Sequence, residues 1–67
     1  MGSVARVTEI SAISEQSFED AIRLGVERAS QTLRNLQSAW VKEQEVEISG
    51  DKVTGYKVNL QVTFVLE

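Results

Sequence analysis

The chain contains no cysteine and no histidine, and these two absences exclude several classes of function. Without cysteine it can have neither disulfides nor thiolate metal sites. Without histidine it lacks the commonest general base and the commonest metal ligand. Any metal site must therefore be built from oxygen ligands, which suit Ca2+ or Mg2+ rather than Zn2+ or Cu2+.

Basic side chains and long apolar runs are also scarce. Seven Lys and Arg stand against ten Asp and Glu, a formal charge of -3, and they form no basic stripe along any predicted element. This argues against a nucleic-acid partner. No apolar run has the length of a membrane span, and no secretory signal pattern opens the chain. We therefore expect a cytoplasmic protein without a membrane partner.

The length of 67 residues indicates a single domain, which we expect to span residues 1–67. A chain this short buries a smaller fraction of its surface than a larger domain does and is marginally stable alone. Natural chains of this size add disulfides, a metal or oligomerisation. The sequence also has no Gly-rich phosphate loop and no serine–base constellation, so we expect no enzymatic activity.

Hydrophobic periodicity predicts the order strand, helix, strand, strand. Residues 4–10 are rich in β-branched side chains and indicate a first strand, followed by a short connection. Ser14 is a suitable N-cap, and a helical apolar stripe continues from Phe18 to Leu36. Gly25 lies on this stripe, where we expect it to let the helix pack closely on the sheet.

Two further strands are predicted at residues 37–48 and 53–66, with a turn at residues 49–52. The last strand alternates cleanly between apolar and polar side chains, which is typical of a half-buried antiparallel strand. The predicted fold class is α+β, with β-α-β-β order and a three-stranded antiparallel sheet packed on one helix. Its open edges invite pairing with other copies, so we expect a closed homo-oligomer.

Matching the apolar faces of the last two strands predicts their register. A three-residue loop, residues 50–52, gives the pairs Val46 with Tyr56, Trp40 with Val62, and Glu45 with Lys57. The last pair joins opposite charges across the strands, worth a few tenths of a kcal/mol to about 1 kcal/mol. Lys42 and Gln44 would then share the face of Trp40. Either that end of the face is wet, or a bulge shifts the register.

Glu43, Glu45 and Glu47 occupy alternate positions of the second predicted strand, about 7 Å apart. Such a row of like charges is either a solvated face, balanced by bases such as Lys57, or a cation site. One strand cannot surround an ion. A cation site would therefore be shared between subunits around a symmetry axis.

Trp40, the only tryptophan, could serve in either of two ways. Its ring could fill a core, or it could form a flat wall against which a planar ligand or a neighbouring subunit stacks. For Tyr56 and Phe64 the alternating pattern favours the core.

Four segments carry a resemblance to a known family, the dodecins: SEQSF at residues 14–18, AI at 21–22, RASQTLRNL at 28–36 and GYKVNLQVTFVLE at 55–67. The resemblance covers almost the whole chain. It implies a hollow homododecamer with 2-3 symmetry. It also implies a protein that binds flavins near its subunit interfaces, as a store or quencher rather than as an enzyme.

The resemblance also implies which residues would contact a flavin. In flavin-binding dodecins a tryptophan stacks on the ring, a glutamine binds its polar edge, and an acidic residue and sometimes an arginine handle the ribityl and phosphate groups. These roles fall on Ser38, Lys57, Glu43 and Glu45 respectively, so only the acidic position is kept. Trp40 lies two residues beyond the stacking position, a shift of about 7 Å along a strand.

The segment Ser38-Ala39-Trp40 is more similar to the calcium dodecin branch, whose members are dodecameric and linked to Ca2+ rather than flavin. The acidic row from Glu43 to Glu47 suits such a role on physical grounds. We therefore expect a non-enzymatic homododecamer that binds Ca2+ through interfacial carboxylates. The alternative is binding of riboflavin or FMN, with Trp40 as the stacking wall and Ser38, Glu43 and Lys57 beside it.

Overall fold

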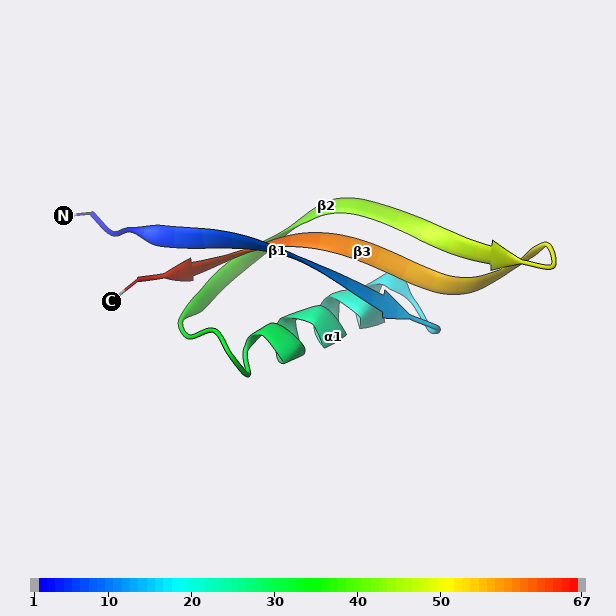
Figure 1. The fold of residues 1–67 in the computed structure, drawn as a ribbon, viewed down its shortest axis with the longest axis horizontal. Coiled ribbons are helices and arrows are strands. Elements are labelled where there is room, and N and C mark those ends of the chain that lie inside the picture. The colour runs from blue at the N-terminus through cyan, green and yellow to red at the C-terminus, as the bar shows by residue number, and fades with distance from the viewer. Residues whose placement is uncertain (1, 67) are drawn as a thin grey trace.

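The computed structural model describes residues 2–66 and consists of one helix packed against a three-stranded antiparallel sheet (Figure 1). In chain order the elements are β1 (Ala5–Ser14), α1 (Phe18–Ala29), β2 (Leu36–Ser49) and β3 (Lys52–Val65). The last strand in sequence is the central one, because the sheet order is β1-β3-β2. The expected α+β class and β-α-β-β order are confirmed.

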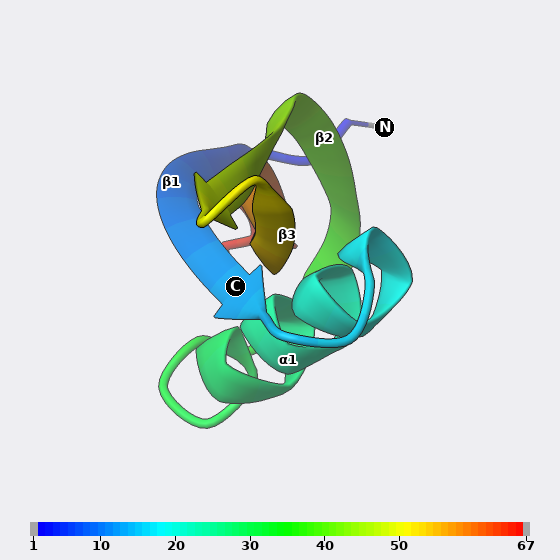
Figure 2. The same ribbon diagram turned by 90° about the vertical axis from the view of Figure 1, so that its right-hand side faces the viewer.

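The core lies between α1 and one face of the sheet. Val58, Leu60 and Val62 of β3 are almost completely buried and pack with Ala21 of the helix. Around them lie partly buried side chains from the other three elements, β1, α1 and β2: Ile10, Ala12, Phe18, Ile22, Val26, Leu36, Ala39 and Val41. Figure 2 shows the strands arching over one side of the helix. One face of the sheet is thus covered by α1, and the other face is free of it.

Gly25 brings the helix close to this sheet, as the sequence predicts. A Cβ atom at this position would lie 3.1 Å from Leu60 Cδ1 and 3.2 Å from Ala12 Cβ. Both distances are shorter than ordinary van der Waals contact. A side chain at residue 25 would therefore push α1 away from β1 and β3.

The first strand and the start of the helix differ from the prediction. β1 continues to Ser14, and the N-cap is Ser17, whose hydroxyl accepts a 2.9 Å hydrogen bond from the amide of Asp20. Ser14 is buried and donates a 2.7 Å hydrogen bond to Asp20. This hydrogen bond lowers the pKa of the Asp20 carboxyl from its ordinary value of 3.8, and so do the hydrogen bond from Arg23 and the charge of its guanidinium.

The prediction that the helix reaches Leu36 is wrong, because α1 ends at Ala29. Ser30 forms the C-cap, and its hydroxyl donates a 2.7 Å hydrogen bond to the carbonyl of Glu27. Such local side-chain bonds compete with continued helix. Asn35 then adopts a left-handed backbone (φ 60°), which turns the chain into β2.

The β2–β3 hairpin has a two-residue loop rather than the predicted three-residue one. Gly50 and Asp51 both have positive φ, 58° and 63°, as a type I′ turn requires. Thr54 is then an extra residue on β3, between the pairs that Ile48 and Glu47 form. This bulge restores the register, so the predicted pairing of Val46 with Tyr56 is confirmed.

The predicted pairing of Trp40 with Val62 is wrong. Lys42 is an extra residue on β2, between the pairs Val41–Leu60 and Glu43–Asn59. It shifts the register by one residue, so Ala39 lies opposite Val62 and Trp40 lies opposite Gln61. Because a one-residue slip reverses the faces of a strand, Trp40 points away from the helix. The bulge that the sequence leaves open as an alternative is present.

Candidate functional site

All the candidate ligand residues lie on the helix-free face of the sheet. On β3 the buried residues alternate with Lys57, Asn59, Gln61 and Thr63, whose side chains point to the opposite face. Cross-strand partners share a face. The partners on β2 are Ser38 with Thr63, Trp40 with Gln61, Glu43 with Asn59, Glu45 with Lys57, and Glu47 with Gly55.

Glu43 is held by a chain of hydrogen bonds that crosses all three strands. The amide nitrogen of Asn59 on β3 donates a 2.8 Å hydrogen bond to Glu43 Oε1. Ser11 on β1 donates in turn to the amide oxygen of Asn59. The hydroxyl therefore fixes the orientation of the amide, and the amide fixes the carboxylate.

Two ion pairs flank this chain on the same face. Lys57 Nζ lies 3.6 Å from Glu45 Oε1, as the predicted strand register requires. Lys42 Nζ lies 3.3 Å from Glu9 Oε1 and reaches across the central strand from β2 to β1. Both pairs are largely exposed to solvent, so each contributes at most about 1 kcal/mol to stability. The carboxylate of Glu45 is thus already paired with the ammonium group of Lys57.

The carboxylate of Glu47 lies across β3 at Gly55. A Cβ atom added to Gly55 would be 2.9 Å from Glu47 Oε1, so a side chain at residue 55 would displace this carboxylate. Ile13 Cγ2 lies on the same side, 3.6 Å from the added Cβ atom. No lysine or arginine of residues 2–66 forms an ion pair with Glu47.

Trp40 is the largest apolar side chain exposed on this face. Its exposed fraction is 64%, so it does not serve as core in the single chain. Ser38 lies on the same face two residues earlier, with no register shift between them. Tyr56, by contrast, is half-buried and packs edge-on against Phe18 at a ring distance of 5.2 Å, as predicted for a core residue.

The acidic row does not form a complete metal site within one chain. Over the described residues 2–66, no group of three carboxylates lies close enough together to hold a metal ion. The face offers exposed carboxylate oxygens, an exposed indole ring and two amides. These groups can form part of a ligand-binding site that another molecule completes.

Comparison with known proteins decides the family. The model of the family Dodecin matches residues 4–67. The chain belongs to the dodecin family. A curated dodecin from Thermus thermophilus is 40% identical over 67 residues, which cover 100% of this chain and 97% of that protein.

Solved structures agree with this assignment. The dodecin from Streptomyces davaonensis has a TM-score of 0.94 and 34% identity, and the match covers 100% of this chain and 98% of that one. A calcium-chelating antigen called calcium dodecin, from Mycobacterium tuberculosis, has a TM-score of 0.83 and 30% identity over 97% of this chain and 93% of that one. That antigen is described as having a novel calcium-binding site.

Membership establishes the general class of function. Dodecins are non-enzymatic binding proteins, which confirms that expectation for this chain. The family binds flavins or, in one branch, calcium, and it forms homo-oligomers. This dodecin is accordingly a small-ligand binding protein. Over residues 2–66 no helix combines the length and the hydrophobicity needed to cross a membrane.

Sequence reasoning missed the residues that position the acidic row. The sequence pattern places Asn59 only on a polar strand face, and Ser11 in a connection between elements. Their contact joins residues 48 positions apart, so it depends on β1 pairing with β3 rather than with β2. Lys42 and Glu9 were missed for the same reason.

Proposed function

We propose that this dodecin is a homo-oligomer that binds Ca2+ through carboxylates gathered where its copies meet. The observation that supports the proposal most strongly is the row Glu43, Glu45 and Glu47, exposed together on the helix-free face of β2. Oxygen-only ligands suit Ca2+, which takes about six to eight of them. The hollow homododecamer that the family resemblance implies is the proposed assembly.

The geometry of a strand explains why several copies are needed. Successive side chains on one face of β2 are about 7 Å apart, whereas Ca2+ binds oxygen at roughly 2.3–2.6 Å. Neighbouring glutamates of one chain therefore do not readily bind the same ion. A symmetry axis, in contrast, brings the same glutamate from each copy to one point.

The three glutamates are not equally available to a cation. Glu43 is oriented by Asn59, and Glu47 has no basic partner among the described residues. Glu45 must first leave Lys57, 3.6 Å away. We expect Glu43 and Glu47 to contribute more to binding than Glu45.

Two observations agree with Ca2+ as the ligand. A protein called calcium dodecin is 30% identical to this chain over nearly its whole length. In addition, two flavin-contacting positions implied by the family resemblance are changed. Ser38 stands in place of the stacking tryptophan, and Lys57 stands in place of the glutamine that binds the ring. A serine has no ring to stack, and this lysine is ion-paired with Glu45.

Calorimetric titration with Ca2+, combined with thermal melts, tests this function. We expect heat of binding and a raised Tm for the native protein, because a ligand that binds only the folded state stabilises it. Glu43→Gln and Glu47→Gln should weaken binding, while Glu19→Gln on the helix is a matched control for loss of one charge. No heat and no Tm shift at millimolar Ca2+ would contradict the proposal.

Riboflavin or FMN is the second candidate ligand, favoured by one observation. Trp40 is 64% exposed and has Gln61 as its cross-strand partner, and the two side chains together offer a stacking surface and a hydrogen-bonding group. Ser38, Glu43 and Lys57 lie on the same face. Strong quenching of riboflavin fluorescence that Trp40→Ala abolishes would favour this function over Ca2+. Glu45 would repel a phosphate, so FMN should bind more weakly than riboflavin.

A further inference from the structure

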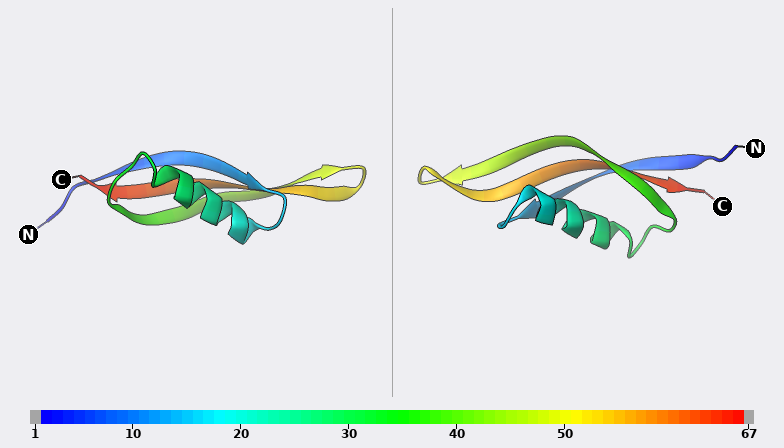
Figure 3. Two further views of the ribbon diagram at one scale, coloured as in Figure 1. Left: turned by 90° about the horizontal axis from the view of Figure 1, so that it is seen from below. Right: turned by 180° about the vertical axis from the view of Figure 1, so that it is seen from behind.

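A pocket between β1 and the end of α1 lies on the opposite face of the sheet from the acidic row. Figure 3 shows the helix lying obliquely across the strands. The pocket has a volume of about 410 Å3. Cavities that hold small ligands usually measure about 300–1,000 Å3. The side chains that line it include Thr8, Ile10, Arg28, Ala29, Thr32 and Leu33.

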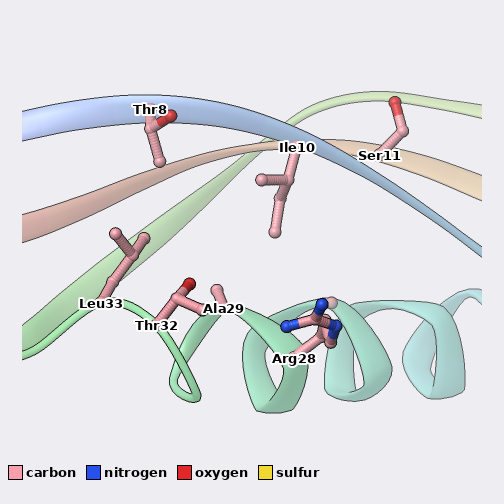
Figure 4. A pocket seen from close by; sticks show the side chains of 8 residues that line it. Thr8, Ile10, Ser11, Arg28, Ala29, Thr32 and Leu33 are labelled. Atoms are coloured by element: carbon pink, nitrogen blue, oxygen red, sulfur yellow. The ribbon is translucent and has the colours of Figure 1, made fainter.

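The floor of the pocket is apolar. Ile10 is the cross-strand partner of the core residue Leu60, so its side chain shares the helix-covered face. In Figure 4 it points from β1 toward the helix, and Ala29 and Leu33 point back toward β1. Gly25 also lines the pocket, and its missing side chain leaves the space beside Ile10 open. An apolar group of a ligand can therefore be buried against these side chains.

The polar part of the pocket holds one cation, Arg28, and the hydroxyls of Thr8 and Thr32. Arg28 forms a 3.3 Å hydrogen bond with Gln31 but no ion pair with a carboxylate of residues 2–66. Within the same range of residues, no Asp or Glu lines the pocket. The planar guanidinium presents several N–H donors in a fork that matches the two oxygens of a carboxylate. An anion can therefore be held at this position.

The end of the helix does little to oppose an anion here. Free carbonyl groups at a helix C-terminus carry partial negative charge and would repel one. In this helix the carbonyl of Glu27 accepts a 2.7 Å hydrogen bond from the hydroxyl of Ser30. The carbonyl of Ala29 accepts a 2.9 Å hydrogen bond from the amide of Leu33. The charge that a ligand meets in the pocket is therefore chiefly the positive charge of Arg28.

We infer that this pocket binds a small monocarboxylate with an apolar body, its carboxylate on Arg28 and its hydrocarbon part on the apolar floor. Within residues 2–66 no second Lys or Arg lines the pocket, so its charge balances one negative charge. A carboxylate carries one, whereas a phosphate monoester carries about −1.5 to −2 at neutral pH. The site shares no residue with the acidic row, so it does not depend on the proposed Ca2+ binding.

Saturation-transfer NMR on the native protein in Ca2+-free buffer tests this site, with hexanoate as the probe. Hexan-1-ol has the same apolar body without the charge, and acetate has the charge without the body. We expect a saturable signal from the hydrocarbon protons of hexanoate. Hexan-1-ol should bind roughly tenfold more weakly, because it loses the hydrogen bonds between charged groups. The absence of a saturable hexanoate signal, or equal affinity for hexan-1-ol or acetate, would overturn the inference.

Two single-charge variants place the carboxylate in this pocket. Arg28→Gln should weaken hexanoate binding roughly tenfold, because the guanidinium is lost. Arg34→Gln removes an exposed arginine outside the pocket and is the matched control, which should keep the native affinity. Arg28→Lys should restore only part of the binding, because an ammonium group lacks the planar fork. Native affinity in Arg28→Gln would overturn the inference, and so would an equal loss in Arg34→Gln, since it would indicate general charge attraction.

Discussion

Asn59 holds the carboxylate of Glu43 with a 2.8 Å hydrogen bond from β3 to β2, on the face of the sheet that the helix leaves free. The amide is itself fixed by Ser11 of β1. The carboxylate that we propose as a Ca2+ ligand is thus oriented by a residue of the neighbouring strand. Such supporting contacts usually matter for affinity nearly as much as the ligands.

Replacement of Asn59 should therefore weaken cation binding without unfolding the protein. For Asn59→Ala we expect a fall in Ca2+ affinity of about tenfold, because the carboxylate of Glu43 becomes free to rotate. Ser11→Ala should have a smaller effect in the same direction, since it acts only through the amide. Calorimetry measures both, and an unchanged affinity in Asn59→Ala would argue against Glu43 as a ligand.

Substitution of Gly25 tests the packing between the helix and the sheet. The Cβ atom of Gly25→Ala would lie 3.1 Å from Leu60 Cδ1, and Leu60 is completely buried. Overpacking costs about 1–3 kcal/mol, and the better helix propensity of alanine offsets roughly 1 kcal/mol of this. Urea denaturation should therefore show a lower free energy of unfolding. A gain in stability would mean that the helix packs less closely than described.

The Ser14–Asp20–Arg23 contacts predict how stability depends on acid. Because the pKa of Asp20 is lowered in the folded state, the unfolded chain takes up a proton at a higher pH than the folded protein does. The stability from Asp20 is complete above its ordinary pKa of 3.8 and is lost as the pH falls through the folded value. Asp20→Asn and Ser14→Ala should both flatten the fall in Tm below about pH 4. If the fall in Tm below about pH 4 were unchanged in both variants, Asp20 would not be the group that causes it.

Trp40 reports on assembly, because it is the only tryptophan and is exposed in the single chain. We expect a subunit contact to cover its ring in the native oligomer. Acrylamide should then quench its fluorescence less in the assembled protein than in protein diluted until the assembly dissociates. Equal quenching in two samples of different mass would show that Trp40 stays in solvent after assembly.

The order of the elements and two pairs of the hairpin, Val46 with Tyr56 and Glu45 with Lys57, were predictable, because they depend on local alternation. The strict period of two in β3 fixes which of its side chains face the core, and Tyr56 opposite Val46 follows from it. The same period places Glu43, Glu45 and Glu47 on one face. A local pattern was sufficient for each of these features.

The features that sequence reasoning missed depend on competition between local and tertiary effects. Leu33 and Leu36 continue the helical spacing of apolar residues, yet α1 ends at Ala29 because Ser30 and Asn35 favour a turn and Leu36 packs as the first residue of β2. The bulge at Lys42 keeps Ala39 and Val41 against the core. The same bulge turns Trp40 to the outer face of the sheet. The alternation of apolar and polar residues does not by itself predict this change.

Terbium luminescence excited through Trp40 tests the central claim most directly. Tb3+ enters oxygen-ligand Ca2+ sites, and its emission is sensitised when a tryptophan lies close by. Trp40 and Glu43 are three positions apart on β2, about 10 Å along the strand. We expect emission that Ca2+ displaces and that Glu43→Gln strongly reduces, with the native emission kept in Glu19→Gln. Absence of sensitised emission from the assembled protein, or full emission from Glu43→Gln, would contradict a cation site built on the acidic row.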